Sequence, residues 1–318
     1  MKKGDSNMKL RGSNEKINPL TSLYVILGLV AVAVPFRMYQ LLNIIESDTG
    51  FYKRVDWSVY LIYGLAVLAV IVPFVLTNLA KNVPESKAPF RKNRFLAATS
   101  IVFAIGLLAD AVICLSNILL SGGSIAMLIV EGGLIGAVEG VFAIFAAIYM
   151  FIFGISYVDG RTTYSQYKFL ALSPLFWSMC RIVIRFVRKI SYINVSDLML
   201  ELFAIAFMMI FFLHLARISS GLSNDKAMRN LFVTGFVSIF FTVTTNLPRL
   251  VMVITGNGRK LPDEYPFALC DLAFAFFAFA YIVNAMKYAE LNDSNELAFE
   301  IYEEAVEENN DEQEEISE

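Results

Sequence analysis

Eight stretches of this chain are long and apolar enough to cross a lipid bilayer. A membrane-spanning helix needs about 20 mostly apolar residues, because each residue advances it by only ~1.5 Å. The candidate spans are residues 20–45, 57–80, 95–120, 132–157, 168–188, 197–218, 229–254 and 266–287. The chain is 57% hydrophobic, above the roughly 45–50% of soluble domains. The blocks therefore predict an all-α, polytopic integral membrane bundle.

The charges in the short loops predict how this bundle is oriented. Most loop lysines and arginines fall on the side that holds the two chain ends, as in the segments 1–16 and 81–94. Cytoplasmic loops carry such an excess of Lys and Arg, so we expect both termini in the cytoplasm. An even number of spans agrees with this, and the short connections predict four out-and-back hairpins in the cell membrane.

The two ends of the chain differ from the eight-helix transmembrane domain, residues 20–287. Residues 1–19 form a basic segment, whereas the tail 288–318 is rich in Asp and Glu and has no Lys or Arg after residue 290. Apolar residues such as Leu291 and Phe299 recur in the tail at near-helical spacing. Two interpretations stay open: a solvated, largely disordered terminus, or an amphipathic helix that binds a basic cytoplasmic protein partner.

Ionisable side chains lie inside the apolar stretches, mostly toward their outer ends. A charge within a span costs about 2.5–3.5 kcal/mol on insertion scales, and it persists where it is paired, faces water or does chemistry. We therefore take these side chains as the candidate ligand-binding residues. They are Arg37, Asp110, Glu139, Arg181, Arg185, Glu201, Arg249 and Asp271.

The positions of these charges predict which of them pair. Residues equidistant from the turn of an antiparallel hairpin lie at one height, so an arginine and an acid in such positions can meet. The predicted pairs are Arg181–Glu201, Arg185–Asp197 and Arg249–Asp271. Arg37 has no acid at its level in its own hairpin, which predicts a pair with Asp110 or Glu139 of another hairpin.

Several function classes lack their sequence signals. No nucleotide-binding loop, dinucleotide fingerprint, zincin motif or nucleophile elbow is present. Cys114, Cys180 and Cys270 are scattered, without the close spacing of a metal or redox motif. No basic stripe with interleaved aromatics suggests nucleic-acid binding. We assign no catalytic residue, metal or cofactor from the sequence.

The remaining signal favours a small transporter or permease component. Its ligand would be a small zwitterion or anion held by the charged layer, with the lipid bilayer as its surroundings. The layer can also be purely structural, because paired charges lock helices together. Two further classes stay open: a sensor or accessory subunit that acts through the acidic tail, and an intramembrane enzyme for a lipid-linked substrate with carboxylates as acid and base.

Overall fold

The computed structural model describes residues 19–46, 51–54, 56–80, 92–120, 133–187, 195–222, 226–258, 261 and 268–287. All eight predicted stretches are confirmed as helices long and apolar enough to cross a membrane. The described residues contain no β-strand, only an isolated antiparallel bridge between Ile45 and Tyr52. The predictions for the segment before Pro19 and for the acidic tail after Lys287 concern residues outside the described ranges.

The helices keep the order that the apolar blocks predict. The main elements are α1 (Pro19–Tyr39) with the π-helix η1 (Gln40–Ile44), α2 (Trp57–Leu79), α3 (Arg94–Leu120), α5 (Gly133–Asp159), α6 (Ser173–Val187), α7 (Val195–Ser219) and α8 (Ala227–Ile254). Two short 3₁₀ turns, Thr163–Gln166 and Leu170–Leu172, lead into α6. The last described helix, Leu269–Lys287, is named the eighth span.

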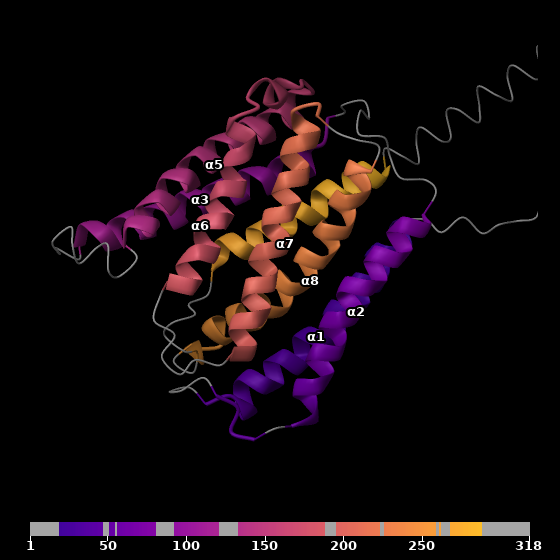
Figure 1. Ribbon diagram of the computed structural model, residues 1–318, viewed down its shortest axis with the longest axis vertical. Helices are drawn as coiled ribbons and strands as arrows, with labels where there is room; N and C mark the ends of the chain where they lie inside the picture. Colours follow the sequence, from indigo (N-terminus) through magenta and orange to yellow (C-terminus); the bar gives the residue numbers. More distant parts are fainter. Residues whose placement is uncertain are drawn as a thin grey trace, which may run out of the picture.

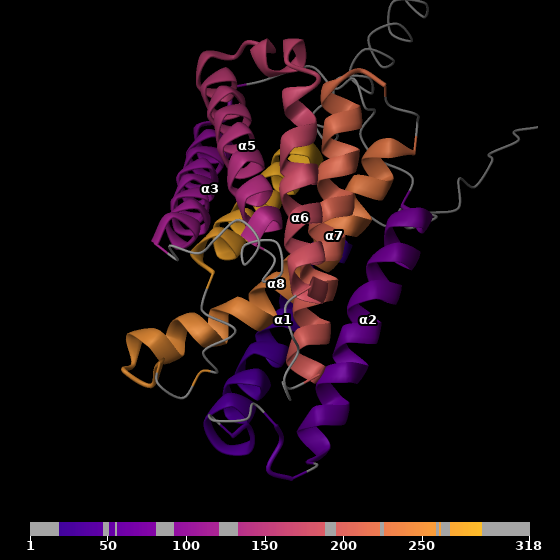
Figure 2. The ribbon, with the colours of Figure 1, turned by 60° about the vertical axis from the view of Figure 1, so that its left-hand side comes forward.

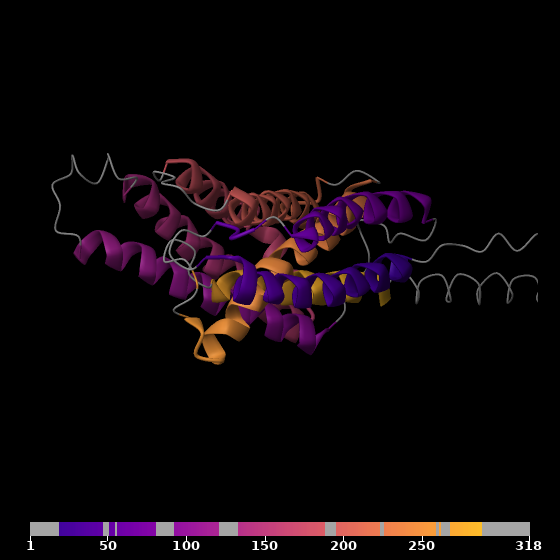
Figure 3. The same ribbon diagram turned by 90° about the horizontal axis from the view of Figure 1, so that it is seen from below.

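Two pairs of helices form the flanks of the bundle, and α6, α7, α8 and the eighth span lie between them (Figure 1). α3 and α5 lie side by side on one flank, and α1 and α2 lie together on the other (Figure 1). α8 contacts α1, α2 and α7, while α6 contacts α5 and α7. Figure 2 shows α2 on the outer edge of this arrangement. Seen from below, the bundle is wider than it is deep (Figure 3).

The eighth span runs through the middle of the bundle and is surrounded by aromatic rings. Phe274 and Phe277 lie with their ring centroids 5.9 Å from that of Phe103 on α3. Phe211 on α7 reaches the same two rings at 5.6 and 6.4 Å. Aromatic pairs at these separations are favourable beyond the area they bury. The aromatic cluster therefore fixes the eighth span, which carries Asp271, against α3 and α7.

Glycines bring α3 and α5 close together. A Cβ added to Gly140 would lie 2.9 Å from the Leu115 side chain, and one added to Gly154 would lie 2.9 Å from Ile101. Small residues at such contacts let membrane helices approach closely, which increases their van der Waals contact. The tight α3–α5 contact at Gly140 sets the separation of two candidate site residues, Asp110 on α3 and Glu139 on α5.

Helix ends explain why the charged residues occur where they do. Asp197 lies in the first turn of α7, and Asp271 is the third residue of the eighth span. Arg37 and Arg185 lie in the last turns of α1 and α6. Acids are favoured at a helix N-terminus and bases at a C-terminus, because the backbone dipoles leave partial charges of opposite sign there. Antiparallel helix ends thus place acids beside arginines.

Candidate functional site

Asp197 is the centre of a buried ion network that joins α1, α6, α7 and α8. One carboxylate oxygen, Oδ1, pairs with Nη2 of Arg37, and the other, Oδ2, accepts from Nη2 of Arg249 at 3.2 Å. Arg37, Asp197 and Arg249 are 1%, 3% and 2% exposed. Such burial makes this carboxylate important to both arginines, since an uncompensated charge in a low-dielectric site is costly.

Arg37 is aimed at Asp197 by groups from α1, α2 and the connection between them. Its Nη1 donates to Gln40 Oε1 at 2.7 Å and to the Tyr52 hydroxyl at 3.3 Å. Gln40 Nε2 donates in turn to Ser58 Oγ at 3.3 Å. Gln40 opens the π-helix η1, a local widening that often occurs at functional sites. The two hydrogen bonds of Nη1 therefore fix the orientation of the guanidinium, with Nη2 directed at the carboxylate of Asp197.

A second carboxylate completes this group, which we call the Asp197 network: Arg37, Arg185, Asp197, Glu201 and Arg249. Glu201 Oε1 pairs with Nη2 of Arg185, and its Oε2 lies 3.6 Å from Nη2 of Arg249. Asp197 and Glu201 are four residues apart, so they share one face of α7. Arg249 therefore reaches both acids of that face.

Four buried oxygen atoms on α7 and α8, the helices that carry Asp197, Glu201 and Arg249, have no hydrogen-bond partner among the described residues. They are Glu201 Oε2 on α7 and Thr242 Oγ1, Thr244 Oγ1 and Asn246 Oδ1 on α8. A buried polar atom without a partner carries a desolvation cost of about 1–3 kcal/mol. On α8 these residues precede Pro248, which lacks a backbone N–H and leaves the carbonyl one turn earlier without its helical donor. This part of α8 is thus rich in acceptors.

Arg181 is the centre of a second group, one turn before Arg185 on α6. Its Nη1 and Nη2 bind the two oxygens of Asp271 on the eighth span, the latter at 3.0 Å. Its guanidinium carbon also lies 5.0 Å from the ring centroid of Trp177. A bidentate guanidinium–carboxylate pair has fixed geometry and strong hydrogen bonds. The contact therefore ties α6 to the central helix.

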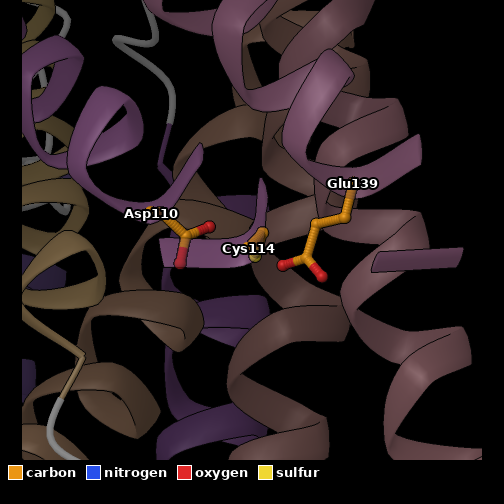
Figure 4. Close-up of side chains that lie close together, drawn as sticks. All are labelled: Asp110, Cys114 and Glu139. Carbon is orange, nitrogen blue, oxygen red and sulfur yellow. The ribbon is translucent and has the colours of Figure 1, made fainter. Parts of the chain in front are cut away.

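Three further side chains belong to this second group. Trp177 Nε1 donates to Asp110 Oδ2 at 2.9 Å, and one ligand atom each of Asp110, Cys114 and Glu139 lies within 4.8 Å of the other two. Figure 4 shows Cys114 between the two carboxylates. We call Asp110, Cys114, Glu139, Trp177, Arg181 and Asp271 the Arg181 network. Its carboxylates and thiol are donors that a divalent cation accepts, and these three are the described residues best placed to hold one.

The structure brings the predicted charged residues together but corrects every predicted pair. Arg181 pairs with Asp271 instead of Glu201, and Arg185 with Glu201 instead of Asp197. Arg249 pairs with Asp197 and lies near Glu201 instead of binding Asp271. Arg37 pairs with Asp197 rather than with Asp110 or Glu139. The prediction from residues equidistant from a hairpin turn was wrong because it assumed that each helix contacts only its hairpin partner. In the structure α8 also packs on α7 and α1.

Asp197 and Cys114 were the main residues that the sequence analysis undervalued. Asp197 entered only as a partner of Arg185, and Cys114 only as a scattered cysteine. A spacing signal existed for both: Asp197 is four residues from Glu201, and Cys114 is four residues from Asp110. Residues four apart share a helix face. The spacing shows that each of these two residues lies beside a candidate site residue, but it does not show which helix faces meet in the bundle.

Comparison with known proteins gives no match to a protein-family model, to a curated protein or to a solved structure. The eight apolar helices are those of a multi-pass membrane protein in contact with a lipid bilayer.

Proposed function

We propose that this protein is a small membrane transporter or permease-like component whose Asp197 network binds a small anionic or zwitterionic solute. The observation that carries the proposal is the sharing of one buried carboxylate, Asp197, by Arg37 and Arg249 from two different helices. A solute that brings its own carboxylate or similar anion can replace Asp197 on these guanidiniums. In the absence of solute, the Asp197 carboxylate then occupies the position that the anionic group of the solute would take.

This exchange would couple binding to helix movement. Asp197 belongs to α7, Arg37 to α1 and Arg249 to α8, so release of the carboxylate loosens three helices at one point. A ligand shifts a conformational equilibrium only through a difference in its affinity for the two states. Replacing an internal ion pair supplies that difference. In this proposal both termini are cytoplasmic, the helices are four hairpins and the network lies in the outer leaflet of the cell membrane.

The test is solute exchange by the purified protein in liposomes. Vesicles preloaded with unlabelled organic acids or amino acids are diluted into the labelled solute, and uptake is compared with protein-free vesicles. We expect uptake with the natural chain and loss of most of it with Arg249→Gln. Arg229→Gln is the matched control on α8, because among the described residues Arg229 donates to the carbonyls of Asn78 and Ala80 and to no member of the Asp197 network. The proposal fails if no solute of either class is moved.

An intramembrane enzyme is the second candidate function, because Asp110 and Glu139 converge. Their carboxylate oxygens lie within 4.8 Å of each other and of Cys114. Two carboxylates at this separation can act together on one substrate, one as the proton donor and the other as the proton acceptor. This is the arrangement that acid–base chemistry on a lipid-linked substrate needs. An enzyme of this type would lose turnover in Asp110→Asn, whereas transport through the Asp197 network would persist.

A further inference from the structure

We infer that the solute taken by the Asp197 network is a short zwitterion, with one carboxylate and one ammonium group. This inference rests on the proposed function, because it assigns a ligand to the same site. The carboxylate would lie on Arg37 and Arg249. The ammonium group would be received by the acceptor row, defined as Glu201 Oε2, Asn246 Oδ1 and Thr242 Oγ1.

The acceptor row supplies oxygen atoms that have no hydrogen-bond partner among the described residues, although Glu201 Oε2 forms an ion pair with Arg249 at 3.6 Å. All three atoms are buried and without a hydrogen-bond partner, and their residues are 3%, 2% and 0% exposed. The Glu201 and Asn246 atoms can only accept, so a ligand that satisfies them must donate. An ammonium group carries three donors and a positive charge, which also suits the Glu201 carboxylate.

Arg249 lies next to the acceptor row on both α7 and α8. Thr242, Asn246 and Arg249 are spaced by four and three residues on α8, which places them on one helix face. Arg249 from this face reaches Glu201 Oε2 of α7 at 3.6 Å. Ring contacts of Phe241 with Phe203 and Phe207, at centroid distances of 5.5 and 5.9 Å, hold α7 and α8 together just below.

These positions limit the length of the zwitterion. The anion site at Arg249 and the nearest acceptor, Glu201 Oε2, adjoin each other. Asn246 lies three residues away along α8, or about 4.5 Å at ~1.5 Å per residue, and Thr242 lies about 6 Å beyond it. The two ligand charges can therefore be separated by one to a few methylene groups, as in glycine, β-alanine or γ-aminobutyrate.

A simple anion fits these observations less well. Acetate or butyrate can replace Asp197 on the arginines, but neither leaves a donor for Glu201 Oε2 or Asn246 Oδ1. The buried acceptors would then gain no hydrogen bond and would continue to cost free energy. A sodium ion can also bind oxygen atoms, so the experiment must separate an ammonium group from a bound cation.

The experiment measures binding to the purified full chain in detergent through ligand-induced thermal stabilisation. The probes are glycine, β-alanine and γ-aminobutyrate, each compared with its deaminated acid (acetate, propionate, butyrate) and its decarboxylated amine (methylamine, ethylamine, propylamine). Because a hydrogen bond to a charged group is worth about 1.5–3 kcal/mol, we expect at least one amino acid to bind about 10- to 100-fold more tightly than its acid. Sodium chloride is compared with choline chloride alone.

Two matched threonine substitutions on α8 test the acceptor row itself. Thr242→Val removes a hydroxyl without a hydrogen-bond partner among the described residues, so the unliganded protein should be as stable as before. The ratio between the affinity for an amino acid and that for its deaminated acid should fall at least threefold. Thr234→Val removes a hydroxyl that already donates to Asn230 and Leu231. It should leave the affinity ratio unchanged, which controls for the loss of a hydroxyl.

Each outcome decides between the inference and the proposed function. Acids that bind as tightly as the amino acids overturn the zwitterion and leave the proposed function standing. Stabilisation by sodium alone, with no added effect of the amino acids, overturns the inference because the acceptors would then hold an ion. If no acid or amino acid stabilises the protein, the inference fails, whereas the proposed function fails only if the liposomes take up no solute of either class.

Discussion

The Asp197 network and the Arg181 network differ in the sign of the charge that dominates them. Among the described residues, the Asp197 network gathers three arginines around two carboxylates, whereas the Arg181 network gathers three carboxylates around one arginine. Both receive a residue from α6, since Arg181 and Arg185 lie one turn apart. A single helix therefore contributes one arginine to a network with an excess of arginines and one to a network with an excess of carboxylates.

The way in which each arginine is held also differs. Asp271 gives both of its oxygens to Arg181, and Trp177 covers the same guanidinium. Asp197 instead divides its oxygens between Arg37 and Arg249. A bidentate pair, in which one carboxylate binds one arginine through both oxygens, is typical of a contact that stabilises the fold. We expect a carboxylate that gives only one oxygen to each of two arginines to be easier for a competing anion to replace. Both networks are buried, so burial alone does not distinguish an ion pair that stabilises the fold from one that could bind a ligand. The way in which the carboxylate oxygens are divided among the arginines provides the distinction.

Loss of the shared carboxylate should give the largest effect. Asp197→Ala removes the carboxylate that pairs with both Arg37 and Arg249, and removing one partner of a buried pair costs about 3–5 kcal/mol. Asp271→Ala should cost less, because Arg181 stays within electrostatic reach of Asp110 and Glu139. The free energy of unfolding in mixed detergent micelles measures both. Equal losses, or a greater loss for Asp271→Ala, would break the contrast between the two networks.

A double-mutant cycle should show that Arg181 and Asp271 act as a closed pair. Removing both charges, with Arg181→Met and Asp271→Leu, should destabilise less than the two single changes added together. We expect a coupling free energy in the upper part of the usual range of about 0.5–3 kcal/mol. The cycle of Arg181→Met with Glu201→Leu should give a coupling near zero, because these side chains belong to different networks. A large coupling between Arg181 and Glu201, with a small one between Arg181 and Asp271, would show that the two networks act as one.

The indole of Trp177 should contribute a smaller amount. Trp177→Phe keeps an aromatic face for Arg181 but removes the donor to Asp110. Loss of this hydrogen bond should cost about 1 kcal/mol, measured as a shift in the unfolding midpoint. The same substitution should leave ligand binding at the Asp197 network unchanged. A loss of binding would show that the Arg181 network takes part in the site.

Neutralisation of Asp110 should have the smallest effect. Asp110→Asn keeps an oxygen acceptor for Trp177 and removes the repulsion between two carboxylates within 4.8 Å of each other. We expect a change within about 0.5 kcal/mol, toward greater stability. Serine in place of Cys114 serves as the control, since it alters the same cluster without a change in charge. A large destabilisation by Asp110→Asn would indicate that its charge balances Arg181.

The amino-acid sequence by itself determined the eight helices and the set of charges between them. Apolar blocks of this length can satisfy their backbone hydrogen bonds in lipid only as helices, so their positions followed within a few residues. The cost of charge in lipid marked the arginines and acids as residues that need partners.

The pairing of those charges was decided only by tertiary structure. Arg185 meets Glu201 instead of Asp197, one helical turn from its expected level, because the long guanidinium side chain can reach a turn away and because α8 brings Arg249 to the same acids. Arg37 and Asp197 are 160 residues apart, and no local spacing rule joins them. Helix packing, set by aromatic rings and close glycine contacts, determines which charged ends meet, and that choice separates the two networks.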